Sequence, residues 1–268
     1  MAPTGTIRAG IGGWTFAPWR GTFYPKDVRQ KDELNYASSQ LATIEINGTY
    51  YGTQKPATFA KWANDVPEGF VFSVKGNRFV TNRRVLTEGA ESMERFLGSG
   101  ITELGAHLGP ILWQFAPTKK FDPDDFGAFL SMLPQSRDGV PLKHALEVRH
   151  DSFSSPEFVA LAARHGAAIV YSQHLKYPEI ADVSAPFIYA RLQKGQDDIP
   201  TAYPPEDLDL WAQRARTWAD GGAPDGLSYA DANHSAEATP RDVFVYFIHE
   251  GKIRAPQAAM ALQERCAG

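Results

Sequence analysis

The sequence predicts an α/β fold, a TIM-barrel-like (β/α) barrel of eight mostly parallel strands, in a single domain over residues 1–268. Eight short apolar segments, many of them rich in β-branched residues, recur along the chain, and segments of helical length separate most of them. Eight strands close such a barrel, and nearly continuous apolar strands are typical of a parallel sheet covered on both faces. The length of 268 residues also fits one barrel domain.

Strands and helices alternate through most of the chain. In chain order, the predicted strands cover residues 7–11, 43–46, 70–74, 111–115, 145–148, 168–171, 187–192 and 243–248. The clearest amphipathic helices cover residues 31–41, 56–66, 88–104, 123–133, 155–165, 204–219 and 256–263. Two of these have favourable starts, because Asp122 precedes Pro123 and Ser155 precedes Pro156.

The alternation is irregular in two places. Residues 172–186, after the sixth strand, show no helical pattern, so we expect an irregular crossover there. Residues 221–240 are rich in Gly, Pro, Asp, Asn and Ser, which predicts a long loop before the eighth strand. That loop would lie at the N-terminal face of the barrel, which usually serves stability rather than chemistry.

The composition narrows the class of protein. Hydrophobic residues at 43% and charged residues at 22% exclude wholesale disorder, and the net charge of −4 argues against a general nucleic-acid or anionic-membrane binder. No apolar run is long enough to span a bilayer, and no basic segment followed by an apolar one marks a secretory signal. We therefore expect a cytoplasmic protein. Its single cysteine, Cys266, excludes an internal disulfide and a thiolate metal site.

Chemistry in a TIM barrel takes place at the C-terminal ends of the strands and in the loops that follow them. The charged residues predicted at these ends include Glu45, Lys75, Glu147, Arg149 and Arg191. Glu45 alternates with Asn47, and Glu147 alternates with Arg149, so each pair points to one face of its strand. Facing inward, these residues would form a ring of mixed charge at the barrel mouth.

Two interpretations of this ring stand side by side. The charges could satisfy one another as a structural network, because an unpaired buried charge is costly. Alternatively, Lys75, Arg149 and Arg191 bind a small anionic molecule, since guanidinium groups suit the paired oxygens of a carboxylate or phosphate. Glu45 or Glu147 would then be the general acid or base of a hydrolase, lyase or isomerase without a cofactor. That role requires at least one of these carboxylates to reach an open pocket.

Further candidates follow the strand ends. His150 precedes Asp151 after the fifth strand, which suits a catalytic base with its orienting carboxylate and equally suits the start of a helix. Additional predicted substrate contacts are Trp14, Asn47, Tyr50, Gln114 and His249. The aromatic residues among them are suited to stacking on a ligand, although core packing is their commoner role.

Two other functions remain open. A divalent-metal hydrolase or isomerase would use ligands from Glu45, Glu147, His150 and Glu250, but the cations at the same mouth would repel a metal ion. A non-catalytic module would bind nucleic acid or a protein through the basic segment that contains Asn77, Arg78, Asn82, Arg83 and Arg84. A solvated basic loop is the simpler explanation of that segment.

Several blocks of the sequence resemble one known family. They are residues 12–16 (GGWTF), 19–25 (WRGTFYP), 43–51 (TIEINGTYY), 72–75 (FSVK) with Thr81, 108–115 (LGPILWQF), 145–150 (ALEVRH) and 189–192 (YARL). Together they span almost the whole chain and resemble the motifs of the YecE-like family, catalogued as domain of unknown function seventy-two. The resemblance implies a TIM-barrel-like fold and no established reaction. It implies candidate site residues at Trp14, Glu45, Asn47, Lys75, Gln114, Glu147, Arg149 and Arg191.

The last strand departs from the family pattern. Members often carry Tyr-Phe-Asn-Asn-Asp there, whereas this chain has Ile248, His249 and Glu250 after Tyr-Phe. The helix start that follows also differs. Members read Ala-Pro-x-Asn-Ala there, whereas this chain has Ala-Pro followed by Gln257 and Ala258. Because two amides are lost, we expect a ligand contact or an acid–base role at this strand to differ in this branch.

Overall fold

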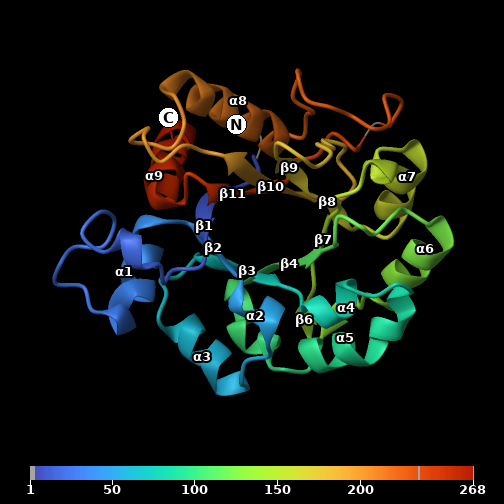
Figure 1. The fold of residues 1–268 in the computed structure, drawn as a ribbon, viewed down its shortest axis with the longest axis horizontal. Helices are drawn as coiled ribbons and strands as arrows, with labels where there is room; N and C mark the ends of the chain where they lie inside the picture. The colour runs from blue at the N-terminus through green and yellow to red at the C-terminus, as the bar shows by residue number, and fades with distance from the viewer. Residues whose placement is uncertain (1–3, 235, 268) are drawn as a thin grey trace.

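The computed structural model describes residues 4–234 and 236–267, and it shows a parallel sheet curled into a nearly closed barrel with helices around it (Figure 1). The barrel strands are β1 (Ile7–Gly12), β2 (Thr43–Ile46), β3 (Val71–Lys75), β4 (Leu108–Gln114), β7 (His144–Glu147), β8 (Ala168–Ile169), β9 (Tyr171–Gln173), β10 (Phe187–Lys194) and β11 (Asp242–Glu250). They pair in the order β8-β7-β4-β3-β2-β1-β11-β10-β9, and each of these pairs is parallel. The predicted TIM-barrel-like fold is confirmed.

The predicted sixth strand is divided in two. Its first part, β8, pairs with β7, and its second part, β9, pairs with β10. Val170 lies between the two parts, and its amide donates a hydrogen bond to the carbonyl of Leu146 at 3.0 Å. The segment therefore changes partners halfway along, and the continuity of the chain, rather than a ladder between β8 and β9, closes the barrel.

The longer helices cover the outside of the barrel (Figure 1). They are α1 (Glu33–Gln40), α3 (Pro56–Asn64), α5 (Ala90–Leu97), α6 (Pro123–Met132), α7 (Pro156–Arg164), α8 (Pro205–Ala219) and α9 (Ala255–Ala267). Asp122 accepts hydrogen bonds from the amides at the start of α6, and Ser155 accepts one from the amide of Phe158 in α7. Both are the capping roles that the sequence predicts.

The helix predicted over residues 88–104 is wrong in extent. α5 ends at Leu97, and Gly100 has a φ of 98° before a separate 3₁₀ segment, Ile101–His107. Glycine adopts this left-handed conformation at little steric cost, so a turn of Gly98, Ser99 and Gly100 ends the helix. Apolar residues continue beyond the turn because Ile101 and Leu104 are also buried, and this continuation explains the longer prediction.

Short elements follow several strands and escape sequence analysis because one turn is too short to show a period. They are α2 (Gly48–Tyr51), α4 (Arg78–Thr81), and the 3₁₀ turns Ala17–Trp19, Gln30–Asp32, Leu86–Gly89, Asp151–Phe153 and Lys252–Arg254. A small antiparallel hairpin of β5 (Ser136–Arg137) and β6 (Val140–Pro141) precedes β7. Three of the short elements, α2, Ala17–Trp19 and Lys252–Arg254, contribute residues to the C-terminal mouth of the barrel.

The two irregular segments pack against each other. Residues 174–186, all of which the structure describes, contain no helix, as expected. The amide of Ala181 donates to the carbonyl of Ser228 at 2.8 Å, and Asp182 accepts hydrogen bonds from the amides of Ala230 and Asp231 at 2.6 and 3.0 Å. Because the segments lead into β10 and β11, these contacts lie at the N-terminal face, opposite the mouth.

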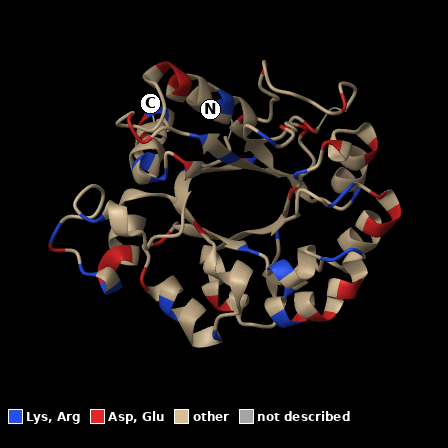
Figure 2. Ribbon diagram, viewed as in Figure 1, with Lys and Arg blue, Asp and Glu red and all other residues tan. Residues whose placement is uncertain are grey.

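Two apolar cores stabilise the barrel. The larger lies between the sheet and the outer helices and includes Trp19, Trp113 and Trp218, each at most 1% exposed. The smaller lies inside the barrel and contains Leu112, Ala145, Ala168, Val170, Phe187, Tyr189, Phe244, Tyr246 and Ile248. Most charged residues lie on the outer helices and loops, with fewer on the strands (Figure 2). Within the described ranges, none of the helices has the length and apolar character needed to cross a membrane.

Candidate functional site

Polar side chains inside the barrel form two layers. Alternate residues on β2, β3 and β10 point inward, which gives the pairs Thr43 and Glu45, Ser73 and Lys75, and Tyr189 and Arg191. The first member of each pair carries a hydroxyl group, and the second carries a charge nearer the mouth. In the hydroxyl layer, Thr43 Oγ1 lies 2.8 Å from Tyr246 Oη, and Ser73 Oγ lies 2.6 Å from Tyr189 Oη.

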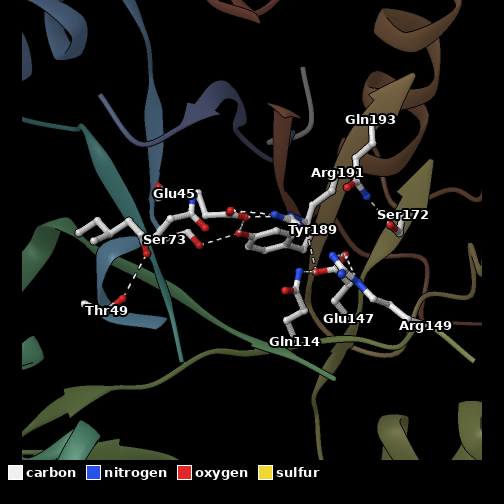
Figure 3. Close-up of polar contacts among 12 residues, drawn as sticks. Glu45, Thr49, Ser73, Gln114, Glu147, Arg149, Ser172, Tyr189, Arg191 and Gln193 are labelled. Atoms are coloured by element: carbon white, nitrogen blue, oxygen red, sulfur yellow. Dashed lines mark hydrogen bonds and ion pairs between the residues drawn. The ribbon is translucent and has the colours of Figure 1, made fainter. Parts of the chain in front are cut away.

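Arg191 lies between two buried glutamates, and we call Glu45, Glu147 and Arg191 the charged layer. Nε and Nη2 of Arg191 donate to the two carboxylate oxygens of Glu45, both at 3.0 Å, and Nη1 donates to Oε2 of Glu147 at 2.6 Å (Figure 3). Tyr189 Oη also donates to Glu45 at 2.7 Å, and Gln114 Nε2 donates to Glu147 at 2.5 Å. Five donors from β4 and β10 thus hold the two carboxylates.

The charged layer is buried, since Glu45 and Glu147 are 0% exposed and Arg191 is 5% exposed. Burial by itself would raise the pKa of Glu147, but the charges of Arg191, Arg149 and Lys75 outweigh burial and hold this pKa well below its usual range. Burial likewise opposes the charge of Arg191, yet Glu147 and Glu45 raise its pKa above the usual value. Glu147 and Arg191 are therefore both charged at neutral pH.

The acid–base role predicted for Glu45 and Glu147 required one of them to reach an open pocket. Neither does, and all four of their carboxylate oxygens accept at least one hydrogen bond: Arg149 Nη2 donates at 3.0 Å to the Glu147 oxygen that Arg191 leaves free. The geometry favours the structural interpretation of these two glutamates, and we assign no acid–base step to them.

An open cavity of about 910 Å³ lies at the C-terminal mouth, over the charged layer. The charged residues that line it are Lys75, Arg149, Arg191, Lys252 and Glu250. Four cations thus accompany a single carboxylate, and that of Glu250 lies at the rim, with its side chain 59% exposed and 3.2 Å from Nδ1 of His249. Glu45 and Glu147, beneath the lining, offset the charges of Arg191 and Arg149. The remaining excess of positive charge lies on Lys75 and Lys252, and it favours a negatively charged ligand.

Lys75 is a buried cation of this cavity without an ion-pair partner in the described ranges. The residue is 8% exposed, and its Nζ lies 4.5 Å from the centre of the Tyr50 ring. Among the residues that the structure describes, no carboxylate lies within ion-pairing distance of this amine, because Glu45 and Glu147 are bonded to arginines. Burial, and then the charge of Arg191, lower the pKa of Lys75 to about 8.

Aromatic side chains line the same cavity. The Trp14 ring packs edge-to-face on Trp62, with 5.2 Å between ring centroids, and Tyr24 Oη donates to the Trp14 carbonyl at 2.5 Å. Trp19 Nε1 donates to the carbonyl of Lys252 at 2.9 Å, which fixes the turn that carries this lysine. A ligand in the cavity would contact an apolar surface as well as the cations.

The other predicted contacts are only partly brought together. Asn47 and Gln114 line the cavity, whereas Tyr50 lies against Lys75. His150 is not among the lining residues, because its Nδ1 accepts a hydrogen bond from the amide of Ser152 at 3.1 Å and caps the turn Asp151–Phe153. His150 thus has the helix-start role that was its alternative in the sequence.

His249 lines the cavity at the end of β11 with a φ of 71°, a left-handed conformation that is uncommon outside glycine. Leu192 pairs with Phe247 and Lys194 pairs with Glu250, so β11 contains one residue more than β10 over this stretch. Such a β-bulge re-aims side chains at the end of a strand. The His249 ring lies 5.6 Å from the ring of His174.

Sequence analysis missed several lining residues, and for Trp62 and Lys252 the reason is physical. Trp62 lies on α3, where a tryptophan in an amphipathic pattern reads as core. Lys252 lies in a 3₁₀ turn beyond the last strand, and only the turn brings it back over the mouth. A search for aromatic residues on helices that follow C-terminal strand ends would have found the first of them.

The metal and basic-segment hypotheses receive different support. Residues 4–234 and 236–267 contain no cluster of three or more His, Cys, Asp or Glu side chains that could hold a metal ion. In the basic segment, the guanidinium carbon of Arg78 lies 5.7 Å from the Tyr51 ring centre and 5.3 Å from the Phe79 ring centre. These two rings are 67% and 52% exposed.

Comparisons with known proteins agree with this architecture. A family model described as "Protein of unknown function DUF72" matches residues 8–268. The chain belongs to the DUF72 family. UPF0759 protein YunF of Bacillus subtilis is 26% identical to this DUF72 protein over 157 residues, which cover 57% of this chain and 54% of YunF. The match thus spans about half the length of that curated relative.

Solved structures of the same family share the fold. A DUF72 family protein from Enterococcus faecalis V583 is 17% identical, with a TM-score of 0.70 over 98% of this chain and 96% of that one. A DUF72 family protein from Thermotoga maritima MSB8 is 21% identical, with a TM-score of 0.68 over 96% of this chain and 97% of that one. At these identities the similarity establishes the fold alone.

Proposed function

We propose that this DUF72 protein binds a small anionic molecule in the cavity at the barrel mouth. The observation that carries the proposal is the charge of the lining, four cations with one carboxylate at the rim. The two buried carboxylates are bonded to Arg191 and Arg149 and offset the charge of these two cations, so the excess lies on Lys75 and Lys252, which have no carboxylate partner among the described residues.

Arg149 is the residue we assign to direct anion contact. Its side chain is 18% exposed, its Nη2 bonds Glu147 at 3.0 Å, and its guanidinium carbon lies 4.8 Å from the Tyr177 ring centre. The carboxylate and the aromatic ring fix the planar group, and its remaining N–H groups can bond a carboxylate or phosphate. Arg191, beneath it, holds Glu45 and Glu147 in place.

Titration with inorganic phosphate and with pyruvate tests the proposal, read by calorimetry and by tryptophan fluorescence, since Trp14, Trp19 and Trp62 line the cavity. Arg149→Gln should weaken binding about 10- to 100-fold, the value of a hydrogen bond to a charged group. Arg95→Gln, on the outer helix α5 with its side chain 67% exposed, is the matched control. Absence of binding by both anions, or equal affinity in the two variants, would overturn the proposal.

A second candidate function rests on the exposed stack of Tyr51, Arg78 and Phe79. Exposed aromatic rings beside arginines are suited to single-stranded nucleic acid, because bases stack on rings and phosphates attract guanidinium groups. Binding of a fluorescein-labelled oligothymidylate should fall steeply with salt and should be lost in Phe79→Ala with Arg78→Gln. Binding that is absent, or insensitive to these changes, would remove this candidate.

A further inference from the structure

We propose that Lys75 is a nucleophile that forms an imine with the carbonyl group of the bound anion. The substrate class is then an aldehyde or ketone that carries a carboxylate or a phosphate. This inference rests on the proposed anion site and adds the reactive group to it. Four features carry it: the fixed position of Lys75, the absence of an ion-pair partner for its amine, the charges around it, and the cations that would hold the substrate.

The backbone of Lys75 is fixed on two sides. Lys75 pairs with Leu112 of β4, and the next amide, that of Gly76, donates to the carbonyl of Leu112 at 2.8 Å. Thr49 Oγ1 donates to the carbonyl of Lys75 at 2.7 Å. The side chain therefore enters the cavity from a rigid strand end, which is the position from which a barrel presents reactive groups.

Amine chemistry needs a lysine that is not paired with a carboxylate. In the described part of the chain, the amine of Lys75 has the Tyr50 ring as its close neighbour at 4.5 Å, and no ion pair. A lysine whose only task was structural charge balance would be expected to pair with Glu45 or Glu147. Arg191 bonds both of these glutamates instead, so Lys75 retains a free donor and a free lone pair when it is neutral.

The charges around Lys75 favour its neutral form. Burial has the largest effect; Arg191 and Arg149 act in the same direction, and Glu45 and Glu147 oppose them. With a pKa of about 8, roughly a tenth of the amine is neutral at pH 7, against well under a thousandth for an ordinary lysine. A desolvated lysine near other cations is a known way to activate this side chain as a nucleophile.

The reaction balances without an oxidant or a reductant. The lone pair of Nζ attacks the carbonyl carbon, and the carbonyl oxygen takes up a proton to give a carbinolamine. Loss of that oxygen as water, with both amine protons accounted for in the water released, leaves a C=N bond. Uptake of one proton from water then gives the protonated imine, which withdraws electrons from the adjacent carbon, so a C–H or C–C bond there is weakened, while Arg149 and Lys252 hold the anionic end.

Reductive trapping on the full chain tests the proposal. The protein is incubated with sodium cyanoborohydride and, in separate arms, with pyruvate, glyoxylate, dihydroxyacetone phosphate or glyceraldehyde 3-phosphate. Intact mass and peptide mapping should show one adduct, the added compound less one oxygen atom, on Lys75 at a level at least tenfold above that on any other lysine. The carboxylate arms and the phosphate arms distinguish the two kinds of anion. Excess inorganic phosphate should protect Lys75, and this readout needs no variant.

Lys75→Arg keeps the positive charge and cannot form an imine, and Lys61→Arg is the control, since Lys61 lies on α3 with its side chain 66% exposed. Lys75→Arg should abolish the adduct, while Lys61→Arg should change neither the adduct nor the phosphate affinity. Phosphate binding without any Lys75 adduct would overturn the nucleophile and leave the anion site intact. Labelling spread over lysines according to exposure would also overturn it. Loss of both readouts in the natural chain would overturn both proposals.

Discussion

The charged layer and the cavity surface above it contain the same residue types and behave in opposite ways. In the layer, Arg191 is bonded to two glutamates and is 5% exposed, and all four carboxylate oxygens are occupied. At the surface, Lys75 has no carboxylate partner in the described ranges, and Arg149 uses only part of its donor set. Burial is similar for Arg191 and Lys75. The difference therefore shows that the capacity of a cation here to bind or react depends on whether it has a carboxylate partner.

Removal of Arg191 should have the largest effect on stability and tests the difference between the charged layer and the cavity surface. Arg191→Met leaves Glu45 and Glu147 buried without their main cation, so we expect the free energy of unfolding to fall by about 3–5 kcal/mol. Urea unfolding followed by circular dichroism measures this. Lys75→Met, at a position with no ion pair to break, should cost less than about 1 kcal/mol or stabilise the protein. Equal losses in the two variants would contradict the distinction between layer and surface.

The pH dependence of stability is a second test of the difference between the charged layer and the cavity surface. The folded state lowers the pKa of Lys75 to about 8, so between about pH 8 and the unfolded value near 10.4 the unfolded chain binds more protons. The cost of the buried charge is therefore present in full below pH 8 and is relieved as the pH rises through this window, by about 3 kcal/mol. The difference in unfolding free energy between the natural chain and Lys75→Met should change by this amount from pH 7.5 to 10.5. A flat difference would show that the amine is solvated.

For the charged layer at low pH, we expect the buried charge to stabilise the folded state, the opposite of its effect at Lys75. The pKa of Glu147 is depressed in the folded state by its cations, against the effect of burial, so its contribution to stability is present above the unfolded pKa and declines as the pH falls below it. Glu147→Gln should therefore flatten the loss of stability between about pH 5 and pH 2. Acid unfolding profiles of the two proteins provide the measurement, and parallel profiles would contradict the assignment.

The smallest effect is expected at the bulge in β11. His249 has a φ of 71°, which glycine and asparagine adopt more readily than histidine does. His249→Gly and His249→Asn should each raise the free energy of unfolding, measured by urea denaturation, by up to about 1 kcal/mol. Gly should also weaken phosphate binding if the imidazole contacts the anion, whereas His165→Gly, at a position outside the cavity, should not. A loss of stability in both His249 variants would show that the ring contributes packing.

The inward positions of the site could be predicted because they follow from the period of a strand. Glu45, Lys75 and Arg191 lie at the C-terminal strand ends, as the pattern of β2, β3 and β10 requires. The pairing among them could not be predicted, because it depends on the register between strands far apart in the sequence. Arg191 on β10 meets Glu45 on β2 across the barrel, although the two strands are not neighbours in the sheet.

Local chemistry explains the remaining differences between expectation and structure. Asp151 follows His150 in a pattern that fits a catalytic pair and a helix start alike, and only the hydrogen bond to the amide of Ser152 decides between them. The site at Lys252 depends on a turn at Gly251, whose φ of 67° reverses the chain over the mouth. Neither feature has a periodic signal.

At one place around the barrel, between β8 and β9, neighbouring strands are connected by the covalent chain and not by strand pairing. β8 pairs with β7, β9 pairs with β10, and Val170 joins β8 to β9. The sheet is therefore open between its two edge strands, and only the backbone at Val170 connects them. We expect a small rotation about this residue to widen or narrow the barrel, with strain on the hydrogen bond from the Val170 amide to the carbonyl of Leu146. Gln193 lines the cavity and donates to Ser172 of β9 at 2.6 Å. The width of the cavity over the charged layer would therefore change with such a rotation.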